Sequence, residues 1–377
     1  MYATTANHFQ LSIFNFQFLP NHAECEDIYM AFKRVTMQDI ADACGLSRNT
    51  VSKIFNDRGA VPEATRDLVL QKARALGYLT GDEPNLAPRD RRAGTVALLS
   101  CHLPTEFHFC NFFVPAFAEQ LSAYGYTLMV YKLTPEELQQ RRLPARLSLE
   151  ETAGLLAIEV FDRAYMEMMC GLGLPTIFVD AFAGAFQTVV QCDIVSMENV
   201  AGTMAVMNHM IGQGVTRLGF VGDITHCNSF YERWIGYSLA MSQAGLEIDH
   251  SLCIMEKDIT PYESADWMYE QLIQKETLPE AFFCANDLLA IRLMTALKRL
   301  GLSIPEDILV AGFDGQPQAA VVEPALTTVR IPSDEIGRMA ADMLCNRISN
   351  PGLPLTTVYV RTTPVFRRST EKLTIEN

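Results

Sequence analysis

The chain has 377 residues, 49% of them apolar and 20% charged, and a formal net charge of −14. This composition is typical of globular proteins and excludes a disordered chain, and the length predicts two or three domains. No stretch holds the roughly 20 apolar residues that a membrane span needs, so we expect no membrane association. Ten cysteines without a Cys-x-x-Cys pair argue against a zinc ribbon or a disulfide framework and favour the reducing cytoplasm.

Residues 1–32 form an unusual leader. They contain the apolar run "LSIFNFQFLP" but neither Lys nor Arg, and no small-residue cleavage site follows that run. A secretory signal needs both a basic start and a cleavage site. We therefore predict a disordered N-terminal extension over residues 1–32, with Met30 as an alternative start.

Charge is divided unevenly along the rest of the chain. Residues 33–92 carry eleven basic and eight acidic side chains, whereas residues 93–377 carry nineteen basic and thirty-three acidic ones. Because phosphate repels an acidic body, contact with a polyanion is expected only within residues 33–92.

Three short helices are predicted within residues 33–79. The first follows a capping Thr36, the second follows a capping Ser47, and the third runs from about Pro62 to Leu76. Gly45 ends the first helix and begins a tight turn, which is the helix-turn-helix plan. The apolar residues expected to face a shared core recur at helical spacing: Met37, Ile40, Ala41, Cys44, Val51, Ile54, Phe55, Leu68, Val69 and Ala73.

The second predicted helix carries polar side chains on its outer side. Arg48 can pair with guanine and Asn49 with adenine, and Lys53 lies on the same side. The helix N-terminus and the hydroxyls of Thr50 and Ser52 suit phosphate contacts. This pattern favours a nucleic-acid reader, and a small helical module that docks another protein is the alternative.

The stretch "VTMQDIADACGLSRNTVSKIFNDRGAVPEATRDLVLQKARALGYL" closely resembles the DNA-binding domain of the lactose-repressor (LacI/GalR) family. The resemblance implies that residues 33–79 bind double-stranded operator DNA. Lys53 stands where the family usually has Arg, so a two-bond contact to guanine is lost there. The DNA contacts that the resemblance and the helix pattern together indicate are Thr36, Ser47, Arg48, Asn49, Thr50, Ser52, Lys53, Asn56, Leu86 and Arg89.

Residues 80–94 are predicted to be a hinge or linker, and they match the family least well. The family usually has a short helix here, whose Leu wedges into the minor groove. In this chain Pro88 would interrupt such a helix, and Leu86 is the candidate wedge. We expect less bending of the operator, with Arg89 contacting phosphate.

From Thr95 the chain alternates between strand-like and helix-like segments. The strand-like runs are "TVALLS", "TLMVYKL", "GLLAIEV", "PTIFVDA", "RLGFVGD", "AFFCAND" and "ILVAGFDG". The helical stretches are 112–124, 163–170, 230–244, 262–274 and 288–300. Alternation of this kind predicts parallel sheets with helices on both faces, here two sheets.

Polar side chains follow several of these strands. Ligands of open parallel sheets bind outside the carboxyl ends of the strands. The residues expected there are Asp180, Asp223, Asn286, Asp287 and Asp314, with Arg233 in "YERWIGY" beside them. Carboxylates, amides and one Arg suit a ligand rich in hydroxyl groups, such as a sugar.

The resemblance to the family extends over roughly residues 35–370, through "FVDAF", "ERWIGY", "AFFCANDLLAIRLMTAL", "VAGFDG" and "PALTTVRIPSDEIGRMAADML". It implies an N-terminal all-α helix-turn-helix domain followed by an α/β two-lobed core like a periplasmic binding protein. The core would span 95–377, with an N-lobe of about 95–193 and 331–357 and a C-lobe of about 194–330 and 358–377.

Matching the family position by position carries effector contacts onto Asp180, Arg233, Asn286 and Asp314. The loop after the first strand departs from the family and reads "HLPTEFHFCNFF". Phe112 or Phe113 in that loop would stack on a sugar face, and a core position is the alternative.

The interpretation that follows is a cytoplasmic regulator, a repressor, that binds operator DNA as a homodimer under control of a carbohydrate effector. An enzyme on the same scaffold is disfavoured because no GxGxxG, phosphate-binding or GxSxG motif appears. An exported sugar-binding protein is disfavoured by the missing signal and by the DNA-binding front. We expect no cofactor, no metal and no catalytic residue.

Overall fold

The structure is a computed structural model that describes residues 37–55, 61–76, 94–102, 110–257 and 264–371. The chain divides into two compact units, Met1–Asp90 and Arg91–Asn377. The first unit contains three helices within its described residues: α2 (Met37–Cys44), α3 (Arg48–Phe55) and α4 (Glu63–Ala75).

The turn between α2 and α3 depends on two residues. Gly45 has φ +64°, and the next residue, Leu46, donates its backbone N–H to the carbonyl of Ala41 at 2.9 Å. Glycine adopts this left-handed conformation at little cost, so α2 ends there. The side-chain oxygen of Ser47 accepts the backbone N–H of Thr50 at 3.2 Å, which confirms Ser47 as the cap of α3.

The core of the first unit is small. Its buried members are Ile40, Ala41, Val51, Ile54, Val69 and Ala73. The prediction that Leu68 faces this core is wrong, because its side chain is 40% exposed and α4 buries Leu70 instead. The buried residues of α4 are therefore Val69, Leu70 and Ala73, so the prediction holds at Val69 and Ala73 and fails only at Leu68. Predictions for Thr36, Asn56, Leu86, Arg89 and the hinge lie outside the described residues.

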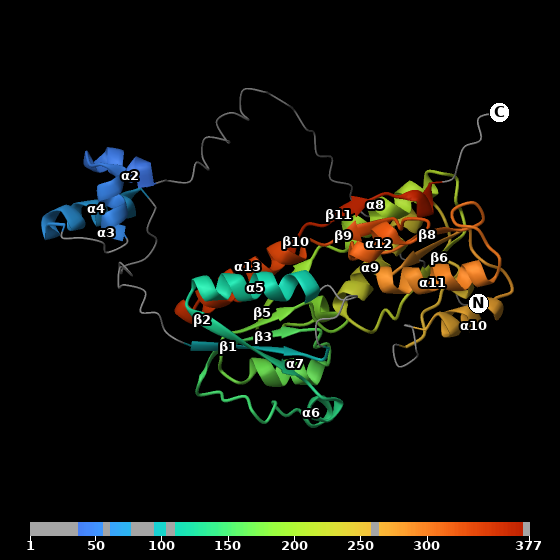
Figure 1. Ribbon diagram of the computed structural model, residues 1–377, viewed down its shortest axis with the longest axis horizontal. Coiled ribbons are helices and arrows are strands. Elements are labelled where there is room, and N and C mark those ends of the chain that lie inside the picture. The colour runs from blue at the N-terminus through green and yellow to red at the C-terminus, as the bar shows by residue number, and fades with distance from the viewer. Residues whose placement is uncertain (1–36, 56–60, 77–93, 103–109, 258–263, 372–377) are drawn as a thin grey trace, which may run out of the picture. The chain divides into compact units, whose positions relative to one another are not determined.

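A six-stranded sheet forms one lobe of the second unit, with the order β10-β5-β4-β3-β1-β2 and every pairing parallel (Figure 1). Its strands are β1 (Gly94–Ser100), β2 (Tyr126–Lys132), β3 (Thr152–Ile158), β4 (Thr176–Val179), β5 (Asp193–Met197) and β10 (Thr357–Val360). The first sheet therefore runs past the expected lobe boundaries, to Met197 and through Val360.

Helices cover both faces of this sheet. Alternate residues of β1 divide between two cores, because successive side chains of a strand point to opposite faces. Val96 and Leu98 pack with α5 (Cys110–Ala123) and α13 (Ser333–Ser349), whereas Ala97 and Leu99 pack with α7 (Arg163–Cys170). Figure 1 shows α5 and α13 side by side on one face and α7 on the other.

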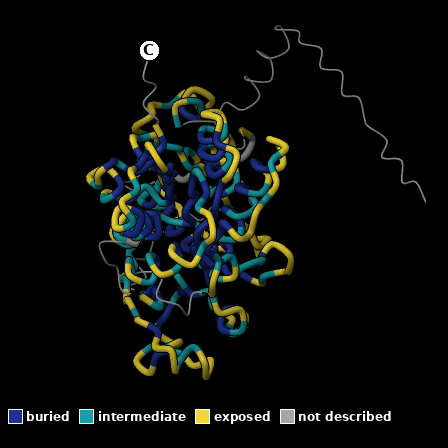
Figure 2. Tube along the Cα trace, turned by 90° about the vertical axis from the view of Figure 1, so that its right-hand side faces the viewer, coloured by how far each residue is buried: buried dark blue, intermediate teal, exposed yellow. Residues whose placement is uncertain are grey.

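The other lobe is built on a parallel three-stranded sheet, β6-β7-β8, and on the antiparallel pair β11-β9. Its strands are β6 (Leu218–Val221), β7 (Ala281–Cys284), β8 (Leu309–Ala311), β9 (Thr328–Arg330) and β11 (Thr363–Val365). Its helices are α8 (Val200–Ile211), α9 (Asn228–Gln243), α10 (Ala265–Ile273), α11 (Asp287–Arg299) and α12 (Pro317–Val321), while the short α6 (Pro135–Gln140) follows β2. Figure 2 shows the buried residues of this second unit gathered in its interior and the exposed ones on its outer loops.

A disulfide joins Cys170 to Cys192, whose Cα atoms lie 5.8 Å apart. The expectation that cysteine spacing argued against disulfides is wrong at this pair. The two residues are 22 positions apart, and the fold alone brings the end of α7 next to the start of β5.

Candidate functional site

The outer side of α3 is the candidate nucleic-acid surface. Arg48, Asn49 and Lys53 are exposed there, while Val51 and Ile54 on the opposite side are buried. α3 has no acidic residue in its first turn. Thr50 and Ser52 are half-buried. The surface therefore combines two basic side chains, an amide and hydroxyl groups, which are the groups that read base edges and phosphates.

Arg233 on α9 lies at the centre of a buried polar cluster in the second unit. Only 2% of the residue is exposed. Its Nε donates to Oδ1 of Asn199 at 3.0 Å, and its Nη1 donates to the carbonyl of Ala285 at 2.5 Å and lies 3.2 Å from Oδ1 of Asp314. The guanidinium carbon lies 3.8 Å from the centroid of the Phe313 ring. Arg233 is thus held on both its edge and its face, which keeps the guanidinium group in one orientation.

Asp180 reaches this cluster from the end of β4. Its backbone has φ +63°, a left-handed conformation that is uncommon for residues other than glycine, although Asp adopts it more readily than most. Its Oδ2 accepts the Ser229 hydroxyl at 2.6 Å, and the carbonyl of Ala181 accepts the Asn228 N–H at 2.8 Å. Because Ser229 and Asn228 begin α9, these hydrogen bonds join the two lobes.

Burial raises the pKa of Asp180 above its usual value, although the Ser229 hydroxyl and the Arg233 charge oppose that shift. Among the described residues, no group donates to Asp180 Oδ1 or to Asn228 Oδ1, and both atoms are buried. A buried oxygen without a donor is costly. A ligand that donates hydrogen bonds to these two oxygens would therefore bind more favourably.

Glu232 connects Arg233 to the segments that link the lobes. It accepts hydrogen bonds from Asn199 Nδ2 at 2.7 Å, Asn228 Nδ2 at 2.8 Å and the Tyr359 hydroxyl at 2.8 Å. Burial nevertheless raises the pKa of its carboxyl group. Asn199 also accepts a hydrogen bond from Arg233, so its side-chain amide connects Glu232 to Arg233. We call this set the seam cluster: Asp180, Asn199, Asn228, Ser229, Glu232, Arg233, Asp314 and Tyr359.

Two of the residues predicted at the carboxyl ends of the C-lobe strands make hydrogen bonds that support the fold. Asn286 caps α11, because its Oδ1 accepts the Leu289 N–H at 2.9 Å. Asp287 is fully buried, and its carboxylate accepts the Thr328 hydroxyl at 2.6 Å and the Gln316 N–H at 2.8 Å. Asp287 therefore fixes the turn after β8. Its burial and the neighbouring Asp314 raise its pKa well above the usual value.

Asp223, which was also predicted at the carboxyl end of a strand, makes local hydrogen bonds as well. Its Oδ1 accepts the backbone N–H and the hydroxyl of Thr225, both at 2.7 Å. These are the hydrogen bonds of an Asx turn, in which an Asp side chain bonds to the backbone two residues further on. A role in ligand contact therefore has no support from these bonds.

The two candidate aromatic residues differ in exposure. Phe113 is completely buried in the core, and its ring stacks on Phe117 with 5.7 Å between centroids. A sugar cannot reach that ring, so Phe113 is a core residue and not an effector contact. Phe112, one position earlier on α5, is 53% exposed.

The fold thus brings Asp180, Arg233 and Asp314 into one cluster, with Asn286 next to the Ala285 carbonyl that Arg233 binds. Several residues at this cluster were not predicted from the sequence: Asn199, Asn228, Ser229, Glu232, Phe313 and Tyr359. Glu232 and Phe313 are chain neighbours of predicted residues, which was a usable signal. Asn199 and Tyr359 lie beside β5 and in β10, two strands that the analysis did not predict.

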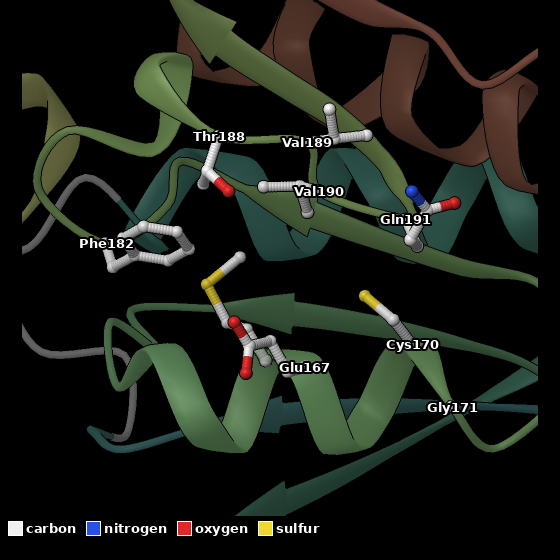
Figure 3. Close-up of a pocket in the computed structure, with 9 residues that line it drawn as sticks. Glu167, Cys170, Gly171, Phe182, Thr188, Val189, Val190 and Gln191 are labelled. Atoms are coloured by element: carbon white, nitrogen blue, oxygen red, sulfur yellow. The ribbon is translucent and has the colours of Figure 1, made fainter.

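A cavity of about 360 Å³ lies between α7 and the segment after β4 (Figure 3). Its walls are mainly apolar, and they are formed by Met166, Glu167, Cys170, Gly171, Phe182, Thr188, Val189, Val190 and Gln191. Within the part of the chain that the structure describes, no group of three or more His, Cys, Asp or Glu could hold a metal ion. No described helix is long and apolar enough to cross a membrane.

Comparison with known families gives two matches. Residues 36–81 match the family described as "Bacterial regulatory proteins, lacI family", and residues 207–370 match the periplasmic binding protein-like domain.

Similar proteins match over most of the chain. The HTH-type transcriptional regulator CelR of Thermobifida fusca is 28% identical over 327 residues, covering 84% of this chain and 93% of CelR. The HTH-type transcriptional repressor PurR of Aliivibrio salmonicida is 26% identical over 347 residues, covering 90% of this chain and 99% of PurR.

Two solved structures share the fold. A complex of the transcriptional regulator CelR with cellobiose superposes with a TM-score of 0.66 at 25% identity, covering 89% of this chain and all of CelR. The lac repressor dimer bound to operator and the anti-inducer ONPF superposes with a TM-score of 0.63 at 20% identity, covering 90% and 99%.

Proposed function

Since this chain is a DNA-binding transcriptional regulator of the lacI family, we propose that it is a repressor whose affinity for operator DNA is set by a sugar bound between the two lobes of its core. It acts in the cytoplasm as a homodimer and needs no cofactor. The DNA contacts come from α3, through Ser47, Arg48, Asn49, Thr50, Ser52 and Lys53.

One observation carries the effector half of this proposal. Asp180 comes from the six-stranded lobe and Arg233 from the other lobe, yet both belong to the seam cluster. A ligand that contacts both residues binds the closed arrangement of the lobes more tightly than an open one. A difference of this kind in affinity is what allows a ligand to shift a conformational equilibrium.

A neutral, hydroxyl-rich ligand suits the groups at this seam. Asp180 and Asn228 each offer a buried oxygen that accepts no hydrogen bond from the described residues, and sugar hydroxyls are donors that would satisfy them. Phe112, Asp180, Arg233, Asn286 and Asp314 are the proposed effector contacts. The CelR relative, which is solved with cellobiose, supports a sugar of that class.

Fluorescence anisotropy of labelled DNA from the upstream promoter tests the proposal. The protein is titrated at several salt concentrations, with and without a panel that includes cellobiose, glucose and their phosphate esters. We expect binding that resists competitor DNA and that one sugar shifts by roughly 5- to 150-fold, the usual range of coupling between sites. Specific binding that no sugar changes would remove the sugar effector but keep the regulator, and no specific binding would overturn the proposal.

A further inference from the structure

The Cys170–Cys192 bond joins the end of α7 to the residue before β5. Stable disulfides are rare in cytoplasmic proteins, where those that do form are usually transient and sense redox state. We propose that this pair is a redox modification site. A cellular dithiol reduces it, and the oxidised form binds the effector more tightly than the reduced form.

Both partners of the bond are held in firm structure. On α7, Met166 and Met169 are completely buried. Next to Cys192, Asp193 pairs with Arg347 through two contacts, Nε to Oδ2 at 2.7 Å and Nη2 to Oδ1 at 2.9 Å. The bond therefore links two anchored points, and it holds the connection between β4 and β5 against α7.

That connection carries several of the contacts between the lobes. Asp180 accepts the Ser229 hydroxyl, and Ala181 accepts the Asn228 N–H. Further along, the Phe186 ring stacks on Tyr231 of α9 with 5.7 Å between centroids. Reduction removes the link between this segment and α7, so that only its contacts with α9 and its continuation into β5 still hold it.

A small dithiol can reach the bond. Cys170 is half-buried and lines the cavity of about 360 Å³, whose other walls include Phe182 and Val190 (Figure 3). Figure 3 shows the Cys170 sulfur pointing from α7 toward the 188–191 segment.

Three other cysteines in the described chain have thiols that resist this chemistry. Burial, with Glu159 and Asp162 nearby, raises the pKa of Cys101 to about 11, and burial raises the pKa of Cys227 and Cys284 well above its usual value. Since the thiolate is the reactive form, these cysteines are poor targets.

The exchange is balanced and reversible. One thiolate of the dithiol attacks a sulfur of the pair, the Cys170–Cys192 bond breaks, and a mixed disulfide forms. The second thiolate then displaces the remaining protein sulfur, so the dithiol is oxidised to its own disulfide. Cys170 and Cys192 together receive two electrons and two protons, and the oxidised dithiol reverses the reaction.

Alkylation at set ratios of reduced to oxidised dithiothreitol tests the site in the full-length native protein. Iodoacetamide labelling and peptide mass spectrometry should show Cys170 and Cys192 gaining label together, at one ratio, and Cys101→Ser should behave like the unaltered chain. Labelling of both cysteines at every ratio would show that no bond forms. A bond that stays intact when the native protein is treated with excess dithiothreitol would equally overturn the site.

Hydrogen exchange and sugar titration test the consequence. The peptide covering residues 180–191 should exchange faster in the reduced protein and in Cys170→Ser, and exchange that is equal in both states would refute the tether. Affinity for cellobiose, which rests on the proposed function, should fall roughly fivefold or more on reduction, and equal affinity would refute the coupling. If cellobiose binds neither the oxidised nor the reduced protein, both the sugar effector and its coupling to the disulfide are refuted. The labelling and hydrogen-exchange experiments still decide whether the redox site exists.

Discussion

The two units of this chain hold their candidate functional side chains in opposite ways. In the first unit Arg48, Asn49 and Lys53 stand exposed on one helix above a core of a few residues. In the second unit Arg233 and Asp180 are buried and hydrogen-bonded to residues of several elements. Substitutions in the first unit should therefore change binding and little else, whereas those in the second should change binding and folding together.

The largest effect is expected from breaking a buried ion pair of the second unit. Arg347→Met leaves Asp193 buried without its partner, which costs about 3–5 kcal/mol of unfolding free energy. Urea unfolding followed by circular dichroism measures this change. The control is Arg142→Met, which breaks the exposed pair with Glu136 and should cost less than about 0.5 kcal/mol. Equal losses in the two variants would contradict the contrast between buried and exposed charges.

A substitution at the contact between α8 and α9 should come next. A Cβ added at Gly236 would lie 2.7 Å from the Val200 carbonyl and 2.8 Å from the Thr203 Cβ. Gly236→Ala should therefore cost about 1–3 kcal/mol of stability and weaken sugar binding, since Arg233 lies on the same helix. Gly352→Ala, whose added Cβ meets nothing within 4 Å, is the matched control. Wild-type stability in Gly236→Ala would show that the two helices can separate freely.

Arg48→Ala should separate binding from folding in the first unit. Loss of a base contact costs about 1–3 kcal/mol of DNA-binding free energy, while an exposed substitution changes stability by no more than about 0.5 kcal/mol. Anisotropy on operator and scrambled DNA measures the specific loss. Gln71→Ala, an exposed change on α4, should bind like the wild type. A fall in thermal stability as large as the fall in affinity would remove the distinction between the two units.

The smallest expected effect is a pH dependence centred on Glu232. Its pKa in the fold lies above the ordinary value of 4.5, so the folded state holds more protons than the unfolded state in that interval. Stability therefore falls as pH rises from about 4.5 through the raised pKa. Glu232→Gln cannot ionise and should lose less stability over this window. Parallel curves of stability against pH for the two proteins would contradict a raised pKa of the Glu232 carboxyl group.

The helices of the first unit were predictable because each has its own local signal. Ser47 and Gly45 mark where α3 begins and α2 ends, and the polar side of α3 follows from Val51 and Ile54 facing inward. The exception, Leu68, shows the limit of spacing alone, because Leu68 and Leu70 both lie next to Val69 and the spacing does not decide which of them is buried.

The buried site was less predictable, because its partners come from distant parts of the chain. Asp180 and Arg233 were predicted from the strand pattern and from the resemblance to a family, but Asn199 and Tyr359 depend on how β5 and β10 meet in the six-stranded sheet. The Cys170–Cys192 bond has the same origin, since cysteine spacing carries no signal for it. The sequence left a sugar contact and a core position open for Phe113, and the structure shows the core position, because Phe113 packs with residues of α13.

The central claim is that DNA on the first unit and a sugar in the second are thermodynamically linked, and a reciprocal titration tests this most directly. Calorimetry gives the sugar affinity of the free and the operator-bound protein, and anisotropy gives the operator affinity with and without the sugar. Linkage requires that both pairs of affinities change by the same factor. Equal factors of about fivefold or more are predicted, and a sugar affinity that operator DNA leaves unchanged would contradict the account.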